Sequence, residues 1–393
     1  MLSPENFYYS FREHYGLPKE NNLIFYPKFD GAKKIQDFTL YQQETFSAYY
    51  YNLSGLERIQ KYGSILLHDQ EPLMDLFYLT RTYLERWFPN GNFDVNQVAQ
   101  IFRLWFPSVK RPILCHSEKN SEEISILNAN GFVDCYYWYH GLISQQWFNH
   151  WRWNRSLDQI EKNTGAKKFM IYSRDFSGTR NYRRKVIDQL SEIRHQVLYD
   201  WEKEKTITSE YSARIDVDDA ANSYIHIVAE TIFDSKKQHF TEKSLKPMVM
   251  SQPFIIFGSP GSLEYLKSYG FQTFDSIWDE SYDREQDSER RMSMIIDLIK
   301  RLEVLPDHEF QKIIRNATPI VQHNRKWFYS LGFYDRLISE LESNMETAFK
   351  IRDDYYAQDP EQWKRLFKKY KGFMSNIKQT NEPMRLSHLL IDI

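Results

Sequence analysis

The sequence predicts an α/β protein with parallel sheets, divided into two halves and followed by a helical C-terminal tail. Short apolar segments alternate with segments of helical spacing, which is the order of elements that parallel sheets require. The chain of 393 residues is long enough for two to three domains of ordinary size. It contains no repeat of 20 to 50 residues, which argues against solenoids and propellers.

Seven short runs rich in β-branched and aromatic residues predict buried strands. They lie at 64–67, 112–115, 132–139, 169–172, 196–199, 224–228 and 254–257. Segments between them have the spacing of helices. Examples are Tyr182, Val186, Leu190 and Ile193, and Ile124, Leu127 and Asn128. The second example is followed by Gly131, a residue type that commonly ends helices.

The boundary between the halves is predicted in the polar segment 156–168, because a strand-like run follows it directly. The prediction gives an N-terminal α/β domain at 1–160, a C-terminal α/β domain at 165–330 and a helical tail at 331–393. We expect the tail to pack across both domains. Its helices and those before it are predicted from apolar spacing at Met292, Ile295, Ile296 and Ile299, and at Leu337, Ile338 and Leu341.

Charge and cysteine content narrow the classes of function. A formal net charge of −2 provides no global field that would draw the chain onto nucleic acid or anionic lipid. Cys115 and Cys135 are too few for a disulfide framework, so a cytoplasmic protein is expected. The sequence begins without the pattern of a secretory leader and contains no stretch of ~20 apolar residues, so we expect neither secretion nor a membrane span.

The most informative segment ends a predicted strand at 228–231 and opens a helix at 240–247. Ligands of parallel α/β sheets bind at the carboxyl ends of strands. Thr241 can cap the helix, whose first amides and positive dipole favour a phosphate. Lys243 adds a mobile charge, and the carboxylates of Glu230 and Glu242 can accept hydrogen bonds from ribose hydroxyls. The segment predicts a nucleotide-diphosphate site, with a capped helix bearing surface charge as the alternative.

A second basic segment also follows a predicted strand. After Ser173 the chain enters a predicted helix that carries Arg180, Arg183 and Arg184. Guanidinium groups match phosphate oxygens, and positive charge in the first turn of a helix opposes the helix dipole. We therefore expect these arginines to bind phosphate. Ordinary pairing on a solvated helix, with Asp188 or Glu192, is the alternative.

Together the two segments resemble the α1,3-fucosyltransferases. In that family a serine-containing strand end and an arginine-bearing helix precede a Glu-Asn-Ser element and then Thr-Glu-Lys. The matching residues here are Ser173, Arg180 and Arg183 for the first element, Glu230 for the second, and Thr241, Glu242 and Lys243 for the third. The similarity covers residues 169–270, including the strand and glycine at 252–258.

The resemblance implies a GT-B fold, in which two Rossmann-like domains face a cleft, and an inverting transfer from a nucleotide-diphosphate sugar. It implies that the arginine and lysine hold the diphosphate and that Glu242 lies against the ribose. The residues predicted to bind the donor are Ser173, Arg180, Arg183, Glu230, Thr241, Glu242 and Lys243. Thr231 and His239 differ from the family's asparagine and aromatic residue at these positions, so GDP-fucose as the donor is not implied.

An inverting transfer needs a general base, and a predicted strand at 64–67 leads into ionisable residues. The family has a Glu-Ser-Pro element whose glutamate is the base, and Glu71-Pro72 is similar to it, so the resemblance makes Glu71 the base. A neighbouring carboxylate and partial burial raise a pKa, which suits proton abstraction. Asp69 is the alternative base, and His68 is predicted to orient either carboxylate or to contact the phosphate. A polar strand end that caps the next helix is the alternative without chemistry.

Two further histidines, His116 and His140, follow predicted strands and are expected to shape the acceptor pocket. A zinc site that combines them with the two cysteines is not expected, because adjacent residues of a strand point to opposite faces. The segment 216–218 matches the short acidic motif with which many glycosyltransferases of the GT-A class bind a metal, but cationic residues are already available for the phosphates, and a solvated acidic loop is the alternative. We therefore expect no metal and no cofactor beyond the nucleotide-sugar co-substrate.

The sequence does not decide whether the acceptor is a glycan or DNA. The segments 151–155 and 364–371 combine basic and aromatic residues, which contact phosphates and stack on bases. A phage-type enzyme that glycosylates hydroxymethylated DNA bases, with the same chemistry, is therefore the leading alternative. A protein that binds a nucleotide sugar or nucleic acid without catalysis is the second alternative, and a retaining enzyme is the third.

Overall fold

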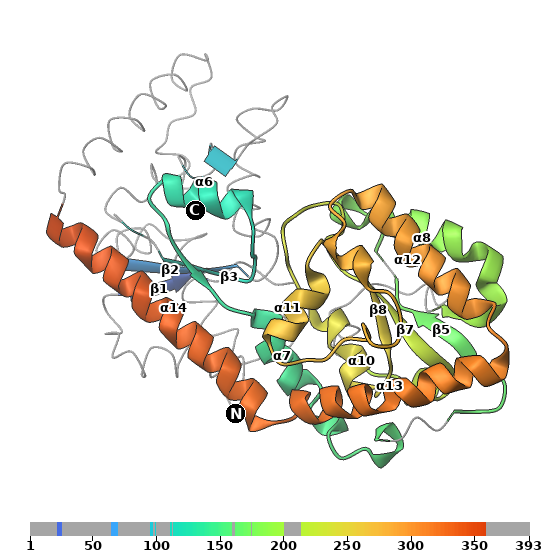
Figure 1. Ribbon diagram of the computed structural model, residues 1–393. Helices are drawn as coiled ribbons and strands as arrows, with labels where there is room; N and C mark the ends of the chain where they lie inside the picture. The colour runs from blue at the N-terminus through green and yellow to red at the C-terminus, as the bar shows by residue number, and fades with distance from the viewer. Residues whose placement is uncertain are drawn as a thin grey trace, which may run out of the picture. The chain divides into compact units, whose positions relative to one another are not determined.

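The structure is a computed structural model of the chain (Figure 1). It describes residues 22–25, 64–69, 95–96, 99, 111, 113–158, 162–173, 175–199 and 214–358. The chain divides into two compact units, one formed by Met1–Tyr139 with Glu340–Ile393 and the other by His140–Ser339. The described strands form two sheets of four parallel strands each, which confirms the predicted α/β class.

The first unit contains a sheet whose strands are ordered as they occur in the chain. They are β1 (Asn22–Phe25), β2 (Ser64–Asp69), β3 (Ile113–His116) and β4 (Val133–Tyr136). The helix α6 (Glu122–Ala129) connects β3 to β4, and Gly131 follows it with a φ of 88°, in the left-handed region that glycine favours. The sequence predicted β2, β3 and β4 but not the four-residue β1.

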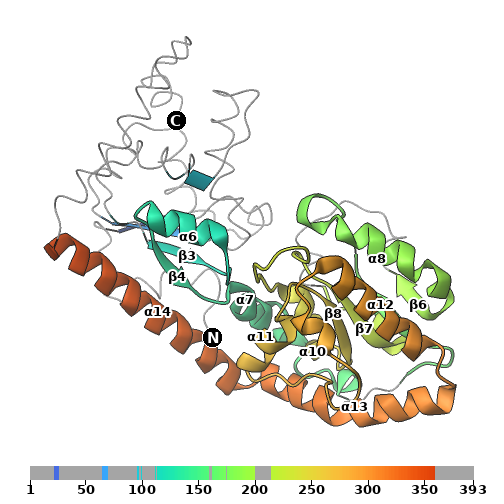
Figure 2. The ribbon, with the colours of Figure 1, turned by 45° about the horizontal axis from the view of Figure 1, so that its top comes forward.

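The second unit contains a sheet with the order β6-β5-β7-β8. Its strands are β5 (Lys167–Ile171), β6 (Val197–Tyr199), β7 (Ser223–Ala229) and β8 (Phe254–Phe257). Helices α8 (Tyr182–Leu190) and α12 (Ser288–Glu303) lie on one side of the sheet, and α13 (Asp307–Phe328) lies on the other (Figures 1 and 2). Burial on both faces explains the nearly continuous apolar runs of these strands.

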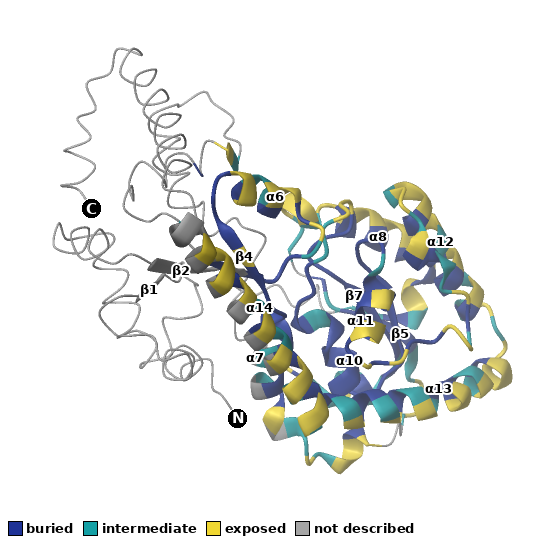
Figure 3. Ribbon diagram, turned by 60° about the vertical axis from the view of Figure 1, so that its left-hand side comes forward, coloured by how far each residue is buried: buried dark blue, intermediate teal, exposed yellow. Residues whose placement is uncertain are grey.

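Helices dominate the last part of the described chain. The predicted apolar positions of α12 are all buried, and Leu337 and Leu341 are buried in α14 (Leu331–Gln358). Figure 3 shows buried and exposed residues alternating along α13 and α14. Within the second unit Phe333 of α14 packs against Phe271, and within the first unit Asn344 donates a hydrogen bond to a strand-end carbonyl. One helix thus contributes contacts to each unit.

Residues 140–158 belong to the second unit, although the predicted boundary lies later, at 156–168. The physical reason is their packing against the end of α13. Gln145, in α7 (Tyr139–Trp147), donates a hydrogen bond of 2.9 Å to the carbonyl oxygen of Phe328. The segment after β4 is therefore part of the second compact unit. The predicted limits of the domains stay a prediction.

Candidate functional site

The second sheet has a topological switch point between β5 and β7. The chain moves from β5 outward to β6 and then returns to place β7 on the other side of β5. In open parallel α/β sheets, ligands bind at the carboxyl ends of the strands at such a point. One predicted phosphate-binding segment follows β5 and the other follows β7. The strand order therefore brings both segments to the same edge of the sheet.

The segment after β5 carries Arg180 in a 3₁₀ turn, η4 (Gly178–Arg180), immediately before α8. The arginine therefore precedes the predicted helix instead of lying within it. Its guanidinium forms an ion pair of 3.2 Å with Asp175, and 27% of its side chain is exposed. The pKa of Asp175 is lowered, because hydrogen bonds from Ser177 and the charges of nearby arginines outweigh the opposing effect of burial. Arg180 is held in place but still faces solvent.

Arg183 differs from the prediction that it presents its guanidinium to a phosphate. The residue is only 2% exposed. Its terminal nitrogens donate to the carbonyl oxygens of Asp175 at 2.9 Å, Ala229 at 2.8 Å and Glu230 at 3.0 Å. Both terminal nitrogens are thus occupied by backbone, and Arg183 connects the segment after β5 to the end of β7. The neighbouring Arg184 is exposed.

Glu230 also differs from its predicted role at the ribose. Its buried carboxylate accepts hydrogen bonds from the amide of Thr231 and from both the amide and the hydroxyl of Thr241 and of Ser244. Burial raises the pKa of Glu230, although Lys243 and the two hydroxyl donors act in the opposite direction. The side chain fixes the following turn to the end of β7. It has no oxygen turned toward solvent.

Thr241 caps this turn as predicted, because its hydroxyl accepts a hydrogen bond from the amide of Lys243 at 3.4 Å. The capped element is the 3₁₀ turn η7 (Glu242–Ser244), and the helix that follows, α10 (Lys246–Val249), has only four residues. Such short elements carry little of the dipole that a long helix supplies. The turn therefore offers a phosphate little helix dipole, and the charge that it can offer comes from side chains.

Lys243 is the partly exposed cation of the second segment. Its ammonium contacts the hydroxyls of Thr241 at 3.0 Å and Thr231 at 3.5 Å, and the carboxylate of Glu242 at 3.4 Å. Its side chain is 28% exposed. Thr231, which differs from the asparagine of the fucosyltransferases, is thus part of the lysine's surroundings. The ammonium is oriented by neighbours and remains accessible from solvent.

Glu242 is a buried carboxylate between cationic groups. One oxygen faces Lys243, and the other lies 3.8 Å from Nε2 of His140. Burial alone would raise the pKa of Glu242, but the charges of Lys243, His140 and Lys246 outweigh burial and lower this pKa to about 2. Glu242 is therefore ionised at neutral pH. His140, which was predicted to shape the acceptor pocket, lies beside this carboxylate and belongs to the second unit.

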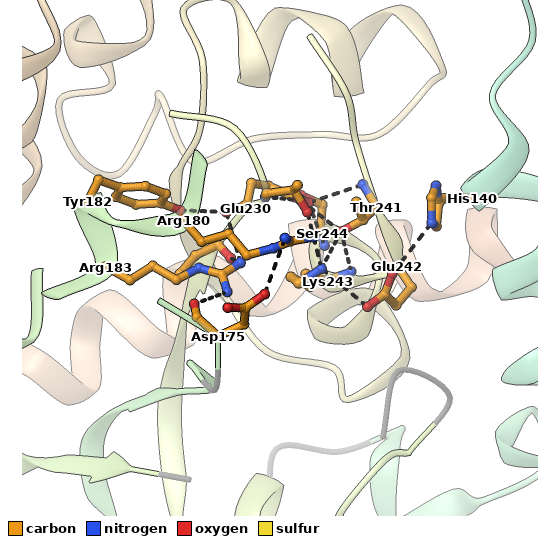
Figure 4. A network of polar contacts seen from close by, with 12 residues as sticks. His140, Asp175, Arg180, Tyr182, Arg183, Glu230, Thr241, Glu242, Lys243 and Ser244 are labelled. Carbon is orange, nitrogen blue, oxygen red and sulfur yellow. Dashed lines mark hydrogen bonds and ion pairs between the residues drawn. The ribbon is translucent and has the colours of Figure 1, made fainter. Parts of the chain in front are cut away.

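A chain of contacts connects the two segments (Figure 4). It runs through Arg180, Asp175, Arg183, Glu230, Thr241, Lys243, Glu242 and His140. Every residue predicted to bind the donor belongs to it except Ser173. That serine is buried two residues after β5, and its hydroxyl has no hydrogen-bond partner among the described residues. A buried hydroxyl of this kind is a candidate for a ligand contact.

The predicted acceptor side lies partly outside the described residues. Glu71 and Pro72 fall there, and for His68 and Asp69 only the strand backbone is described. Asp69 is the register partner of His116 on β3, so both stand at the carboxyl edge of the first sheet. His116 is buried, with Nε2 3.8 Å from a carboxylate oxygen of Asp134, and its ring stands edge-on to a tyrosine.

The acidic segment 216–218 has a local role. Asp216 caps α9 (Val217–Ala221) by accepting hydrogen bonds from the amides of Asp218 and Asp219. Within the described ranges no three His, Cys, Asp or Glu side chains gather as metal ligands. None of the described helices has the length and hydrophobicity that a membrane span requires.

In the segment 151–155, Trp153 is 77% exposed and the guanidinium of Arg152 lies 5.0 Å from its ring centre. The second basic and aromatic segment, 364–371, lies outside the residues that the structure describes.

Besides the burial of Arg183 and Glu230, sequence reasoning missed the structural role of Asp175, the contact between His140 and Glu242, and the burial of Lys246. Only the role of Asp175 could have been recognised from the local sequence, because aspartate side chains commonly accept a hydrogen bond from the backbone two residues later. The other two depend on contacts between distant segments. No protein-family model matches this sequence, and no curated protein matches it either.

Proposed function

We propose that this protein is an inverting glycosyltransferase that moves a sugar from a nucleotide-diphosphate sugar to an acceptor hydroxyl. One observation carries the proposal: two partly exposed cations, Arg180 and Lys243, belong to one contact network at the switch point of β5 and β7. A diphosphate is the common ligand group that suits two cations at such an edge. The GT-B arrangement implied by the resemblance is part of this proposal.

In the proposed reaction the acceptor oxygen attacks the anomeric carbon while the bond to the diphosphate breaks on the opposite side. Negative charge then grows on the departing diphosphate. Arg180 and Lys243 stabilise that charge, and Ser173 supplies a hydroxyl donor. Preoriented cations of this kind act more strongly on the transition state than on the bound substrate. Glu71 takes the proton of the acceptor hydroxyl, with Asp69 as the alternative base.

Donor binding is tested by thermal shift with GDP-, UDP- and ADP-sugars, and with a CMP-sugar as a monophosphate control. A ligand that binds only the folded protein raises its melting temperature. We expect a shift with at least one diphosphate sugar and a much smaller shift in Lys243→Ala. Lys236→Ala is the matched control, because Lys236 is an exposed lysine of the same connection. No shift with any of these donors would contradict the proposal.

Catalysis is separated from binding by Glu71→Gln. A catalyst should lose turnover while keeping the thermal shift of its donor, because the amide cannot accept the acceptor proton. If turnover is unchanged, Glu71 is not the base and Asp69→Asn becomes the next variant. The anomeric configuration of the product, measured by NMR, separates an inverting enzyme from a retaining one.

A DNA acceptor is the second candidate, and the exposed Trp153 with Arg152 beside its ring is the observation that favours it. Exposed aromatic rings stack on unpaired bases, and arginine adds affinity for phosphate. Turnover of the donor should then increase on addition of hydroxymethylated DNA and not of unmodified DNA. Trp153→Ala should weaken that response. A glycan acceptor is favoured if neither DNA changes the turnover.

A further inference from the structure

His140 lies within the donor-side network although its place in the sequence suggested the acceptor side. Nε2 of His140 is 3.8 Å from Oε2 of Glu242, and both side chains are only 6% exposed. The opposite carboxylate oxygen, Oε1, faces the ammonium of Lys243 at 3.4 Å. One buried carboxylate is thus shared by a histidine and by the partly exposed lysine.

We infer that His140 is a positioning residue: by holding the Glu242 carboxylate, it leaves Lys243 available for an anionic phosphate ligand. The inference rests on the proposed function, because it concerns the same phosphate site. It assigns His140 to the control of donor affinity, and it gives Glu242 the role of a counter-charge in place of a ribose contact.

A buried charge that loses its compensating partner destabilises the protein. Glu242 is ionised and buried, so any movement of Lys243 toward a phosphate takes a compensating charge away from it. A protonated His140 keeps that carboxylate compensated while the lysine moves. Without His140, the Glu242 carboxylate holds Lys243 more strongly, and a phosphate must compete with that carboxylate for the lysine.

The surroundings of His140 define the charges that take part. Among the described residues, the titratable and charged groups around this carboxylate and histidine come from three places. They are Glu242 and Lys243 on η7, Lys246 on α10, and Glu230 and His239 in the connection between β7 and η7. The ring of His239 stands edge-on to that of His140 with 5.3 Å between centroids. Lys246 is buried, and its charge also lowers the pKa of Glu242.

The test is the binding of inorganic pyrophosphate to wild type and to His140→Gln, measured by calorimetry at pH 6 and pH 8. Glutamine can donate a hydrogen bond but carries no charge. An ordinary imidazole is protonated below about pH 6.5. We therefore expect wild type to bind about tenfold more tightly than the variant at pH 6, and the ratio to approach one at pH 8. Comparing the two proteins at each pH cancels the titration of pyrophosphate itself.

His308→Gln is the matched control, because His308 is an exposed histidine at the start of α13. It should change the affinity at neither pH. Glu242→Gln provides an independent arm that does not require His140→Gln to fold. It removes the carboxylate that competes for Lys243, so pyrophosphate should bind more tightly and the double variant should show no further effect of His140.

The outcomes separate the inference from the proposed function. Equal affinities of wild type and His140→Gln at both pH values, with binding still weakened in Lys243→Met, overturn the inference alone. Weaker binding in Glu242→Gln also overturns it. Absence of pyrophosphate binding in wild type overturns both the proposed function and the inference.

Discussion

The connections that follow β5 and β7 are both held in place by a buried charged residue, but the residue type differs between them. After β5, the buried Arg183 donates to backbone carbonyls while Arg180 remains partly exposed. After β7, the buried Glu230 accepts from amides and hydroxyls while Lys243 remains partly exposed. Each connection therefore contains a buried charged residue that attaches the loop to its neighbours and a partly exposed cation. Burial, and not residue type, distinguishes the two roles.

The largest expected difference between the roles is in stability. Arg183→Ala should lower the free energy of unfolding by about 3–5 kcal/mol, because it leaves buried carbonyl oxygens without their donor. Arg184→Ala, on the exposed side of the same helix, should change it by less than about 0.5 kcal/mol. Urea denaturation measures both values. Equal effects of the two substitutions would contradict the assignment of Arg183 to the scaffold.

Acid should weaken the connection after β7. The folded protein holds the pKa of Glu242 at about 2, below its ordinary value of 4.5. The resulting stability is fully present above pH ~4.5 and is lost as the pH falls toward 2, with a total of ~3 kcal/mol. Wild type should therefore lose more unfolding free energy than Glu242→Gln between pH 6 and pH 3. Parallel pH profiles of the two proteins would exclude this contribution.

Glu230→Gln tests the buried carboxylate that accepts hydrogen bonds after β7. The amide retains the shape of the carboxylate but turns an NH₂ group toward donors, so we expect a loss of about 2 kcal/mol in unfolding free energy. Pyrophosphate affinity should fall as well, because the turn that carries Lys243 loses its attachment to β7. Glu264→Gln, at an exposed position of α11 (Ser262–Ser268), is the control and should leave both quantities unchanged.

The solvent-facing cations should show the opposite pattern. Lys243→Met and Arg180→Met should each alter the unfolding free energy by no more than about 1 kcal/mol, since partly exposed ion pairs contribute little to stability. Each should weaken pyrophosphate binding by about tenfold, because a charged hydrogen bond to the ligand is lost. Calorimetry and urea denaturation on the same variants test this. A variant that lost stability but kept its affinity would reverse the proposed roles.

The sequence was informative about the sheets because their strands are short, apolar and buried on both faces. It also placed the candidate residues at strand ends, and parallel strands bring those ends to one edge. It did not predict that Arg183 and Glu230 are buried, because their partners come from other connections and local spacing says nothing about depth. The contact between His140 and Glu242 is likewise tertiary. Glu71 remains a prediction.

Glu230 receives hydrogen bonds at two ends of the same residue. Its carbonyl oxygen accepts from Tyr182 at 2.7 Å and from Arg183, while its carboxylate accepts from Thr241 and Ser244. Glu230 thus links α8 to the turn η7. The proposed diphosphate would meet loops that are already joined to each other, so little conformational entropy would be lost in ordering them.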